Sequence, residues 1–144
     1  MPCPVPGLRS PYVSVRGLVH FPRLLDKARL YAAGQLPEDY HTALGKGFDR
    51  RVCEALGLTY KDLAAAAANR PEASDLELLV WAESQGRAIS PGDTEVLSGY
   101  LAKRGWRDDA TETFLARRAS MGAPDSLLTY FELIDWDEAR GPKA

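Results

Sequence analysis

The residues best suited to chemistry in this chain are cations and a tyrosine–histidine pair in its first third. They are Arg9, Arg23, Asp26, Lys27, Arg29, Tyr40 and His41. A guanidinium group can donate two parallel hydrogen bonds to a carboxylate or phosphate, and an ammonium and a phenol add further donors. A small anionic or phosphorylated ligand needs donors of this kind. We therefore predict that these side chains form a ligand-binding site.

A solvated row of ion pairs is the alternative interpretation of the same charges. Asp26 lies three residues after Arg23 and three residues before Arg29, so its carboxylate could reach either cation on a helix surface. Exposed pairs of this kind stabilise a protein by only tenths of a kcal/mol. The sequence leaves open whether the basic helix face lines a pocket or meets solvent.

No motif in the chain identifies a reaction. We find no glycine-rich phosphate loop, nucleophile elbow, His-Glu-x-x-His or paired-cysteine spacing. Cys3 and Cys53 are too few for a disulfide framework or a zinc site, so we expect no metal and no cofactor. A binding protein is therefore expected rather than an enzyme, and the sequence leaves catalysis open only through the Asp39-Tyr40-His41 segment.

Acidic residues near the C-terminus offer little for metal binding. Asp135, Asp137 and Glu138 are close in sequence, but a helix would place them on different faces. We interpret them as solubilising charges at a helix end.

A protein–protein interaction module without a small-molecule site is the alternative function. Leu30 falls on the polar side of the basic helix and is the one visible sign of an exposed apolar surface. Single exposed leucines are common in proteins, so this sign alone identifies no partner. The sequence does not give an oligomeric state.

The overall composition describes a soluble protein of 144 residues with 45% apolar residues and a net charge of −2. Such a balance argues against a dedicated nucleic-acid-binding protein. Residues 1–20 lack the apolar segment of a secretion signal and no stretch could span a membrane, so we expect a cytoplasmic protein. Residues 1–70 hold 10 Lys and Arg against 6 Asp and Glu, whereas residues 71–144 hold 8 against 14. We expect the two halves to attract each other.

The elements that must position these residues are short helices. Pro22 suits a first helical turn, and apolar spacing predicts one face of Leu24, Leu25, Ala28, Tyr31 and Ala32 in a helix that runs to about Ala33. Residues 35–47 are predicted as a loop, followed by a helix from Phe48. Capping patterns predict later helices after Thr59, Ser74, Ser90, Asp108 and Asp125. The helix after Ser74 is expected to bury Leu76, Leu79 and Val80.

These elements predict an all-α fold, a compact single domain of about six or seven short helices with an extended N-terminal arm. Residues 1–7 are expected to form a flexible tail and residues 8–144 one domain, with a hinge at residues 69–74. Residues 12–15 are interpreted as the extended arm, since one isolated strand cannot make a sheet. Gly105 is expected in a left-handed conformation, with Trp106 packed on Leu101.

Several short motifs occur in order along the chain. They are Leu8-Arg9-Ser10-Pro11, Pro22-Arg23, Asp26-Lys27-Ala28-Arg29, Tyr40-His41, Asp49-Arg50-Arg51, Lys103-Arg104-Gly105-Trp106 and Phe131-Glu132-Leu133-Ile134-Asp135. This pattern, over about residues 8–140, resembles a bacterial family known as domain of unknown function 5069. Where that family has Cys-Pro-Leu after the Tyr-His pair, this chain has residues 43–48 without cysteine. The resemblance implies one folded unit and supports the choice of site residues, but it implies no activity.

Overall fold

The computed structural model describes residues 2–141, so Met1 of the expected tail and residues 142–144 of the expected domain lie outside the described residues. The helices are α1 (Phe21–Ala32), η1 (Glu38–Ala43, a 3-10 helix), α2 (Phe48–Leu56), α3 (Tyr60–Asn69), α4 (Asp75–Gln85), α5 (Pro91–Lys103), α6 (Thr111–Ser120) and α7 (Tyr130–Asp137). Two-residue strands β1 (Ser14–Val15) and β2 (Leu18–Val19) precede them. The prediction of an all-α, compact single domain is confirmed. No helix in the described part is long and apolar enough to cross a membrane.

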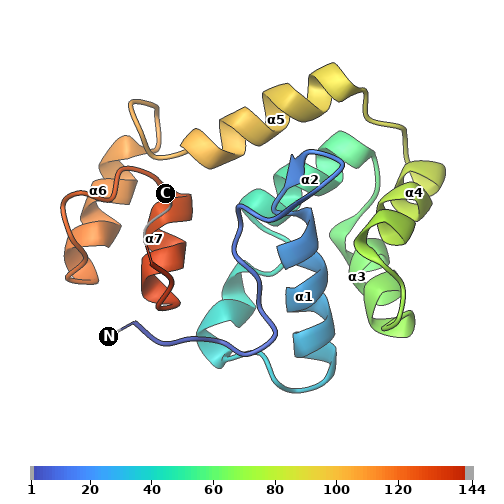
Figure 1. Ribbon diagram of the computed structural model, residues 1–144, viewed down its shortest axis with the longest axis horizontal. Helices are drawn as coiled ribbons and strands as arrows, with labels where there is room; N and C mark the ends of the chain where they lie inside the picture. The colour runs from blue at the N-terminus through green and yellow to red at the C-terminus, as the bar shows by residue number, and fades with distance from the viewer. Residues whose placement is uncertain (1, 142–144) are drawn as a thin grey trace.

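Helix α1 occupies the centre of the molecule (Figure 1). Helices α3 and α4 lie on one side of it and α6 and α7 on the other, while α5 runs along the top and connects the two sides. The hydrophobic core is built from side chains of most of these elements. Its largest members are Leu18, Phe21, Leu24, Leu25, Leu56, Leu63, Leu78, Leu79, Leu101 and Phe131.

The burial of α1 differs from the sequence prediction. All eight residues from Phe21 to Ala28 are buried, including Arg23, Asp26 and Lys27, whereas Tyr31 is 53% exposed. Of the predicted apolar face, Leu24, Leu25 and Ala28 are buried, but Tyr31 and Ala32 are exposed. Of the two interpretations of the basic face, the solvated one does not hold. Helices covered on every side are expected to be apolar, so buried charges in α1 must have partners.

The predicted helix starts were correct where the capping side chain bonds the first turn of its own helix. Thr59, Ser74 and Ser90 each accept a hydrogen bond from the backbone N–H three residues later. The predicted cap at Asp125 was wrong, because α7 begins five residues later with Thr129 as its cap. Asp108 precedes the cap position of α6, and its carboxylate accepts from the N–H groups of Gly105 and Ala110 instead.

Three other sequence predictions need correction. The expected arm pairs with itself, because Ser14 and Val15 of β1 lie antiparallel to β2. The expected loop of residues 35–47 contains the 3-10 helix η1. Helix α4 buries Leu78, Leu79 and Ala82, whereas Leu76 and Val80 are about half exposed, so its predicted apolar face was wrong as well.

The N-terminal segment and the predicted hinge both contact the rest of the domain. The Cys3 N–H donates to the carbonyl of Asp137 at 2.7 Å, and Leu8 is buried. The Arg29 guanidinium donates to the carbonyls of Ala67, Arg70 and Ala73, and the last two lie within residues 69–74. Flexibility of either segment stays a prediction.

The turn after α5 is left-handed at Gly105, as predicted, with φ of +101°. Trp106 is 40% exposed and its ring lies beneath the cations of Lys103 and Arg107, while its contact with Leu101 stays a prediction. A Cβ at Gly105 would lie 3.0 Å from Cγ of the buried Phe114 ring. Crowding is thus added to an unfavourable backbone conformation at this position.

Gly105→Val should therefore lower the free energy of unfolding by about 2 kcal/mol, measured by urea denaturation. Gly122→Val is the matched control, because Gly122 also has a positive φ but a Cβ there would meet nothing within 4 Å. If Gly122→Val loses less free energy of unfolding than Gly105→Val, the difference measures the effect of crowding against Phe114. Equal denaturation midpoints for Gly105→Val and the parent would contradict the prediction.

Candidate functional site

A fully buried carboxylate, Asp49, lies at the centre of the charged residues around α1. Its side chain is 0% exposed and accepts hydrogen bonds from Nε2 of His20 at 2.7 Å and from Nζ of Lys27 at 2.9 Å. The backbone N–H of Gly45 donates a third bond at 3.0 Å. Asp49, in the first turn of α2, thereby binds the N-cap residue of α1, His20, and a residue in the middle of that helix, Lys27.

A second buried pair lies nearby on the same helix. Arg23 donates both terminal nitrogens to the Glu138 carboxylate, at 2.7 and 2.6 Å. Glu138 also accepts from the Tyr40 hydroxyl at 2.9 Å and from Arg140 at 2.6 Å. This geometry joins α1, η1 and the C-terminal end of α7 through one carboxylate.

The pKa values of these groups follow from burial and pairing. Burial opposes the charge on Asp49, but the hydrogen bond from His20 and the charge of Lys27 outweigh it and lower the Asp49 pKa to about 2. Burial lowers the pKa of Lys27, and Asp49 offsets only part of this. Burial is the largest single influence and would raise the pKa of Glu138, but the hydrogen bonds and charge of Arg23, together with the bonds from Arg140 and Tyr40, outweigh it and lower this pKa. Both carboxylates are therefore ionised at neutral pH.

His20 is neutral in this setting. Burial lowers its pKa from 6.5 to about 4, and the hydrogen bond to Asp49 only partly compensates. Because Asp49 is an ionised acceptor, Nε2 carries the imidazole proton and Nδ1 keeps a lone pair. That Nδ1 atom is buried and has no hydrogen-bond partner among the described residues. Most buried polar atoms in proteins have a hydrogen-bond partner, and Nδ1 could accept a hydrogen bond from a donor such as a hydroxyl group.

The backbone of His20 is also unusual. Its φ is +69°, in the left-handed region that non-glycine residues rarely adopt. His20 caps α1 without a side-chain cap bond, and its ring packs 5.6 Å from the ring of Phe48. Such strain persists only where surrounding contacts fix it, and it is found preferentially at functional sites.

A cavity of about 290 Å³ adjoins these groups. Its lining includes His20, Arg23, Lys27, Tyr40, Lys46, Phe48, Arg117 and Glu138. Lys46 and Arg117 are exposed, and neither makes an ion pair with any described residue. The cavity thus combines the paired charges of the buried network with the carboxylates of Asp39 and Asp137 and with two surface cations that make no ion pair in the described part of the chain.

The structure brings only some of the predicted site residues to this cavity. Arg23, Lys27 and Tyr40 line it, whereas Arg9, Asp26, Arg29 and His41 do not. The last four have other partners, and the Arg29 guanidinium donates to the carbonyls of residues 67, 70 and 73. The alternative interpretation, in which Asp26 pairs with Arg23 or Arg29 on a solvated face, does not hold, because Asp26 binds Arg9 and the two cations have other partners.

Arg9 fills the space between α1 and α4. Its guanidinium and backbone N–H bind Asp26, and its terminal nitrogens bind Asp75 at 2.7 and 2.9 Å. His41 Nε2 lies 2.9 Å from the carbonyl oxygen of Leu36, and its ring packs edge-on against Tyr31. These contacts give Arg9, Asp26 and His41 structural partners within the chain.

The acidic C-terminal helix end was misinterpreted from sequence. Asp135 is 5% exposed and Glu138 is 4% exposed, so neither is a solubilising charge. Asp135 accepts from the Ser10 hydroxyl and from Arg140. No group of residues with metal-ligand character is found among residues 2–141.

The predicted set lacked five residues of the site, which are His20, Lys46, Asp49, Arg117 and Glu138. A signal for Asp49 exists, because it precedes Val52, Cys53 and Leu56 by 3, 4 and 7 residues and so shares the apolar face of α2. A carboxylate on an apolar face requires buried partners. Nothing in the local sequence shows that His20 would be that partner.

The neutral state of His20 gives the domain a specific pH dependence. The unfolded chain gains a proton on His20 below pH 6.5, whereas the folded domain does so only near pH 4. The contribution of neutral His20 to the free energy of unfolding should be fully present above pH 6.5. The free energy of unfolding should then fall as the pH decreases, by up to about 1.4 kcal/mol for each pH unit. Urea unfolding between pH 7 and pH 5 measures this slope.

A glutamine at position 20 isolates the contribution of His20. His20→Gln retains an amide donor for Asp49 but cannot take up the proton, so the slope between pH 7 and pH 5 should become shallower. An unchanged slope in His20→Gln would show that His20 is not buried in its neutral form.

A sequence comparison with protein families gives one match. The model described as Domain of unknown function (DUF5069) matches residues 5–140. No curated protein matches the chain.

Proposed function

The chain belongs to the family of domains of unknown function DUF5069, and we propose that it binds a small hydroxylated anion in the cavity beside His20. The description of the family states no activity, so the proposal depends on the geometry of this chain. The ligand class comprises compounds that carry both a hydroxyl group and a carboxylate or phosphate.

The observation that carries the proposal is that Nδ1 of His20, a residue lining the cavity, has no hydrogen-bond partner within residues 2–141. A buried acceptor without a partner costs about 1–3 kcal/mol, which a ligand hydroxyl would recover by donating to it. Asp49 fixes the tautomer by accepting from Nε2. The pair therefore presents an acceptor for a hydroxyl group rather than a donor for an anion.

The anionic part of the ligand is assigned to Lys46 and Arg117. Both line the cavity and neither makes an ion pair within residues 2–141, although the carboxylates of Asp39 and Asp137 line the cavity as well. Arg23 and Lys27 line it as well, but Glu138 and Asp49 already balance their charges. In this arrangement the buried pairs shape the cavity and the two surface cations recognise the anion.

A protein–protein interaction module remains the alternative proposal. Leu30, the residue that suggested it, is only partly exposed, and a Cβ on Gly7 would lie 3.4 Å from its Cδ2 atom. The contact with the N-terminal segment gives Leu30 a partner within the chain. The ligand-binding proposal therefore has the better structural support.

Thermal unfolding with four probes tests the proposed function. Glycerol 3-phosphate and glycolate carry both a hydroxyl and an anionic group, whereas glycerol and inorganic phosphate each carry one. The first two should raise the melting temperature more than the last two, because a ligand that binds only the folded state stabilises it. No rise with any probe would contradict the proposal.

Surface variants make the same test specific to this cavity. Lys46→Ala and Arg117→Ala should reduce the response to glycerol 3-phosphate without changing the melting temperature of the free protein, because both side chains are exposed. Lys61→Ala, an exposed lysine on α3, is the matched control and should respond like the parent. A parent-like response in both cavity variants would place the ligand elsewhere.

A further inference from the structure

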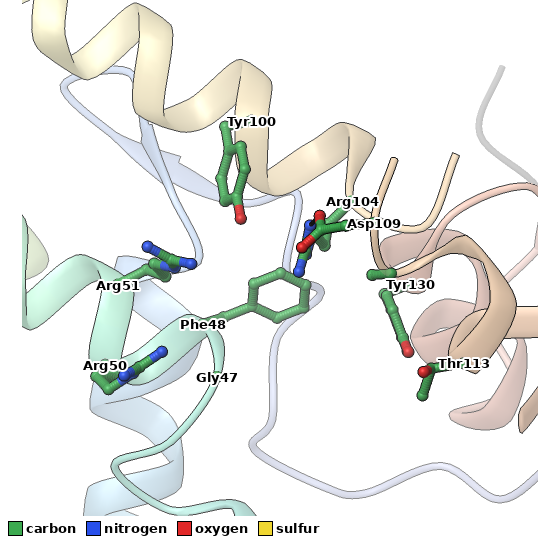
Figure 2. A pocket seen from close by; sticks show the side chains of 10 residues that line it. Gly47, Phe48, Arg50, Arg51, Tyr100, Arg104, Asp109, Thr113 and Tyr130 are labelled. Carbon is green, nitrogen blue, oxygen red and sulfur yellow. Dashed lines mark hydrogen bonds and ion pairs between the residues drawn. The ribbon is translucent and has the colours of Figure 1, made fainter. Parts of the chain in front are cut away.

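A second pocket, of about 420 Å³, is lined by three arginines and three aromatic side chains. Arg50 and Arg51 come from α2 and Arg104 follows α5, while the rings belong to Phe48, Tyr100 and Tyr130. Figure 2 shows the Phe48 ring between the α2 arginines and Arg104, with the Tyr100 hydroxyl directed toward it. Phe48 lines this pocket and the cavity beside His20, so the two are neighbours.

The charges of this pocket are not balanced. Asp109 is the one carboxylate among its lining residues, and it pairs with Arg104. Arg50 has only a loose contact of 3.5 Å with the exposed Glu54. Arg51 makes no hydrogen bond or ion pair through its guanidinium within the described residues. An excess of guanidinium groups in a concave site favours an anionic ligand.

The aromatic rings give the ligand a second required feature. The guanidinium carbons of Arg51 and Arg104 each lie 5.5 Å from the centre of the Tyr100 ring. These contacts hold the two arginines in place without neutralising them. The ring of Phe48 adds an apolar surface beside them. A planar group can stack on such rings while an attached phosphate contacts the guanidinium forks.

We infer that this pocket is a binding site for a small phosphate-bearing compound with a planar ring, of the class of nucleoside monophosphates. Its volume lies within the usual range for small-molecule sites. The site is separate from the cavity that holds His20 and uses none of the residues assigned to the hydroxylated anion. A nucleic acid strand is disfavoured as the occupant, because the chain has a net charge of −2.

Calorimetric titration with three probes tests this inference. Adenosine 5′-monophosphate should bind the parent at least about tenfold more tightly than adenosine or inorganic phosphate, because only the monophosphate uses both the arginines and the rings. No binding of the monophosphate would overturn the proposal. Equal affinity for the monophosphate and inorganic phosphate would overturn the assignment of a planar group.

Two variants locate the site. Arg51→Gln should weaken monophosphate binding by about tenfold or more, and Tyr100→Leu should weaken it while leaving the weaker affinity for inorganic phosphate in place. Arg70→Gln, which changes an exposed arginine outside the pocket, is the control and should bind like the parent. Circular dichroism confirms that each variant is folded. Unchanged monophosphate affinity in Arg51→Gln would overturn the proposal.

Separate variants test the two proposed binding sites independently. Arg51→Gln should leave the thermal response to glycerol 3-phosphate unchanged, and Lys46→Ala should leave monophosphate affinity unchanged. Loss of both responses in one of these variants would overturn the assignment of two separate sites.

Discussion

Asp49→Ala is expected to lower the free energy of unfolding by about 3–5 kcal/mol, one of the two largest effects expected in this domain. Asp49 is 0% exposed and accepts from three donors. Its removal leaves the Lys27 ammonium, which is 9% exposed, without a counter-charge in the protein interior. It also leaves Nε2 of His20 without a partner. Chemical denaturation monitored by circular dichroism measures the loss.

A double-mutant cycle assigns this loss to the buried charge pair. Lys27→Met removes the ammonium, so Asp49→Ala should cost less in the Lys27→Met background than in the parent. Lys27→Met alone should be destabilising, because Asp49 then keeps only His20 and Gly45 as donors. If the two single effects add without coupling, the buried pair does not contribute as described.

Glu138→Ala is the second substitution with a large expected effect, also about 3–5 kcal/mol. It removes both acceptor oxygens of Arg23, whose side chain is 5% exposed, and the acceptor of the Tyr40 hydroxyl. The Arg23 charge would remain buried, and η1 would lose its bond to the end of α7. Urea denaturation is again the measurement.

A surface pair provides the control for Glu138→Ala. The side chains of Arg50 and Glu54 are 60% and 57% exposed and lie 3.5 Å apart, so Glu54→Ala should cost less than about 1 kcal/mol. Similar losses for Glu138→Ala and Glu54→Ala would contradict the buried pairing of Arg23.

The sequence predicted those parts of the fold that depend on local contacts. Ser74 and Glu77 satisfy each other's backbone N–H groups within one turn, so the start of α4 could be read from four residues. The start of α7 could not, because Asp125 and Thr129 both resemble caps. In the structure, the N–H of Tyr130 donates to the carbonyl of Arg104, far away in sequence. Tertiary contacts therefore favour the later start.

The charge asymmetry of the two halves was a more reliable guide than the spacing of individual charges. Ion pairs join Arg9 to Asp75, Arg16 to Glu83 and Arg23 to Glu138, each between residues 1–70 and residues 71–144. Helical spacing instead predicted pairs within α1. Local spacing cannot show that a helix is covered on all sides, and that burial determines which partners its charges find.

The candidate site was predictable only in part for the same reason. Arg23, Lys27 and Tyr40 were identified by their donor chemistry, and all three line the cavity. The partners that define their state, Asp49 and Glu138, lie 22 and 115 residues from their cations in the chain. The unpartnered Nδ1 of His20 arises from packing and a left-handed backbone, neither of which has a sequence pattern.

Nitrogen NMR of the His20 imidazole tests the proposed binding site most directly. At pH 7 the free domain should show a protonated Nε2 and an unprotonated Nδ1, and saturation with glycerol 3-phosphate should shift the Nδ1 resonance as it accepts the ligand hydroxyl. The imidazole of His41 serves as the internal reference and should not change. A proton on Nδ1 in the free domain, or an Nδ1 resonance that stays unchanged with ligand in excess, would contradict the proposed site.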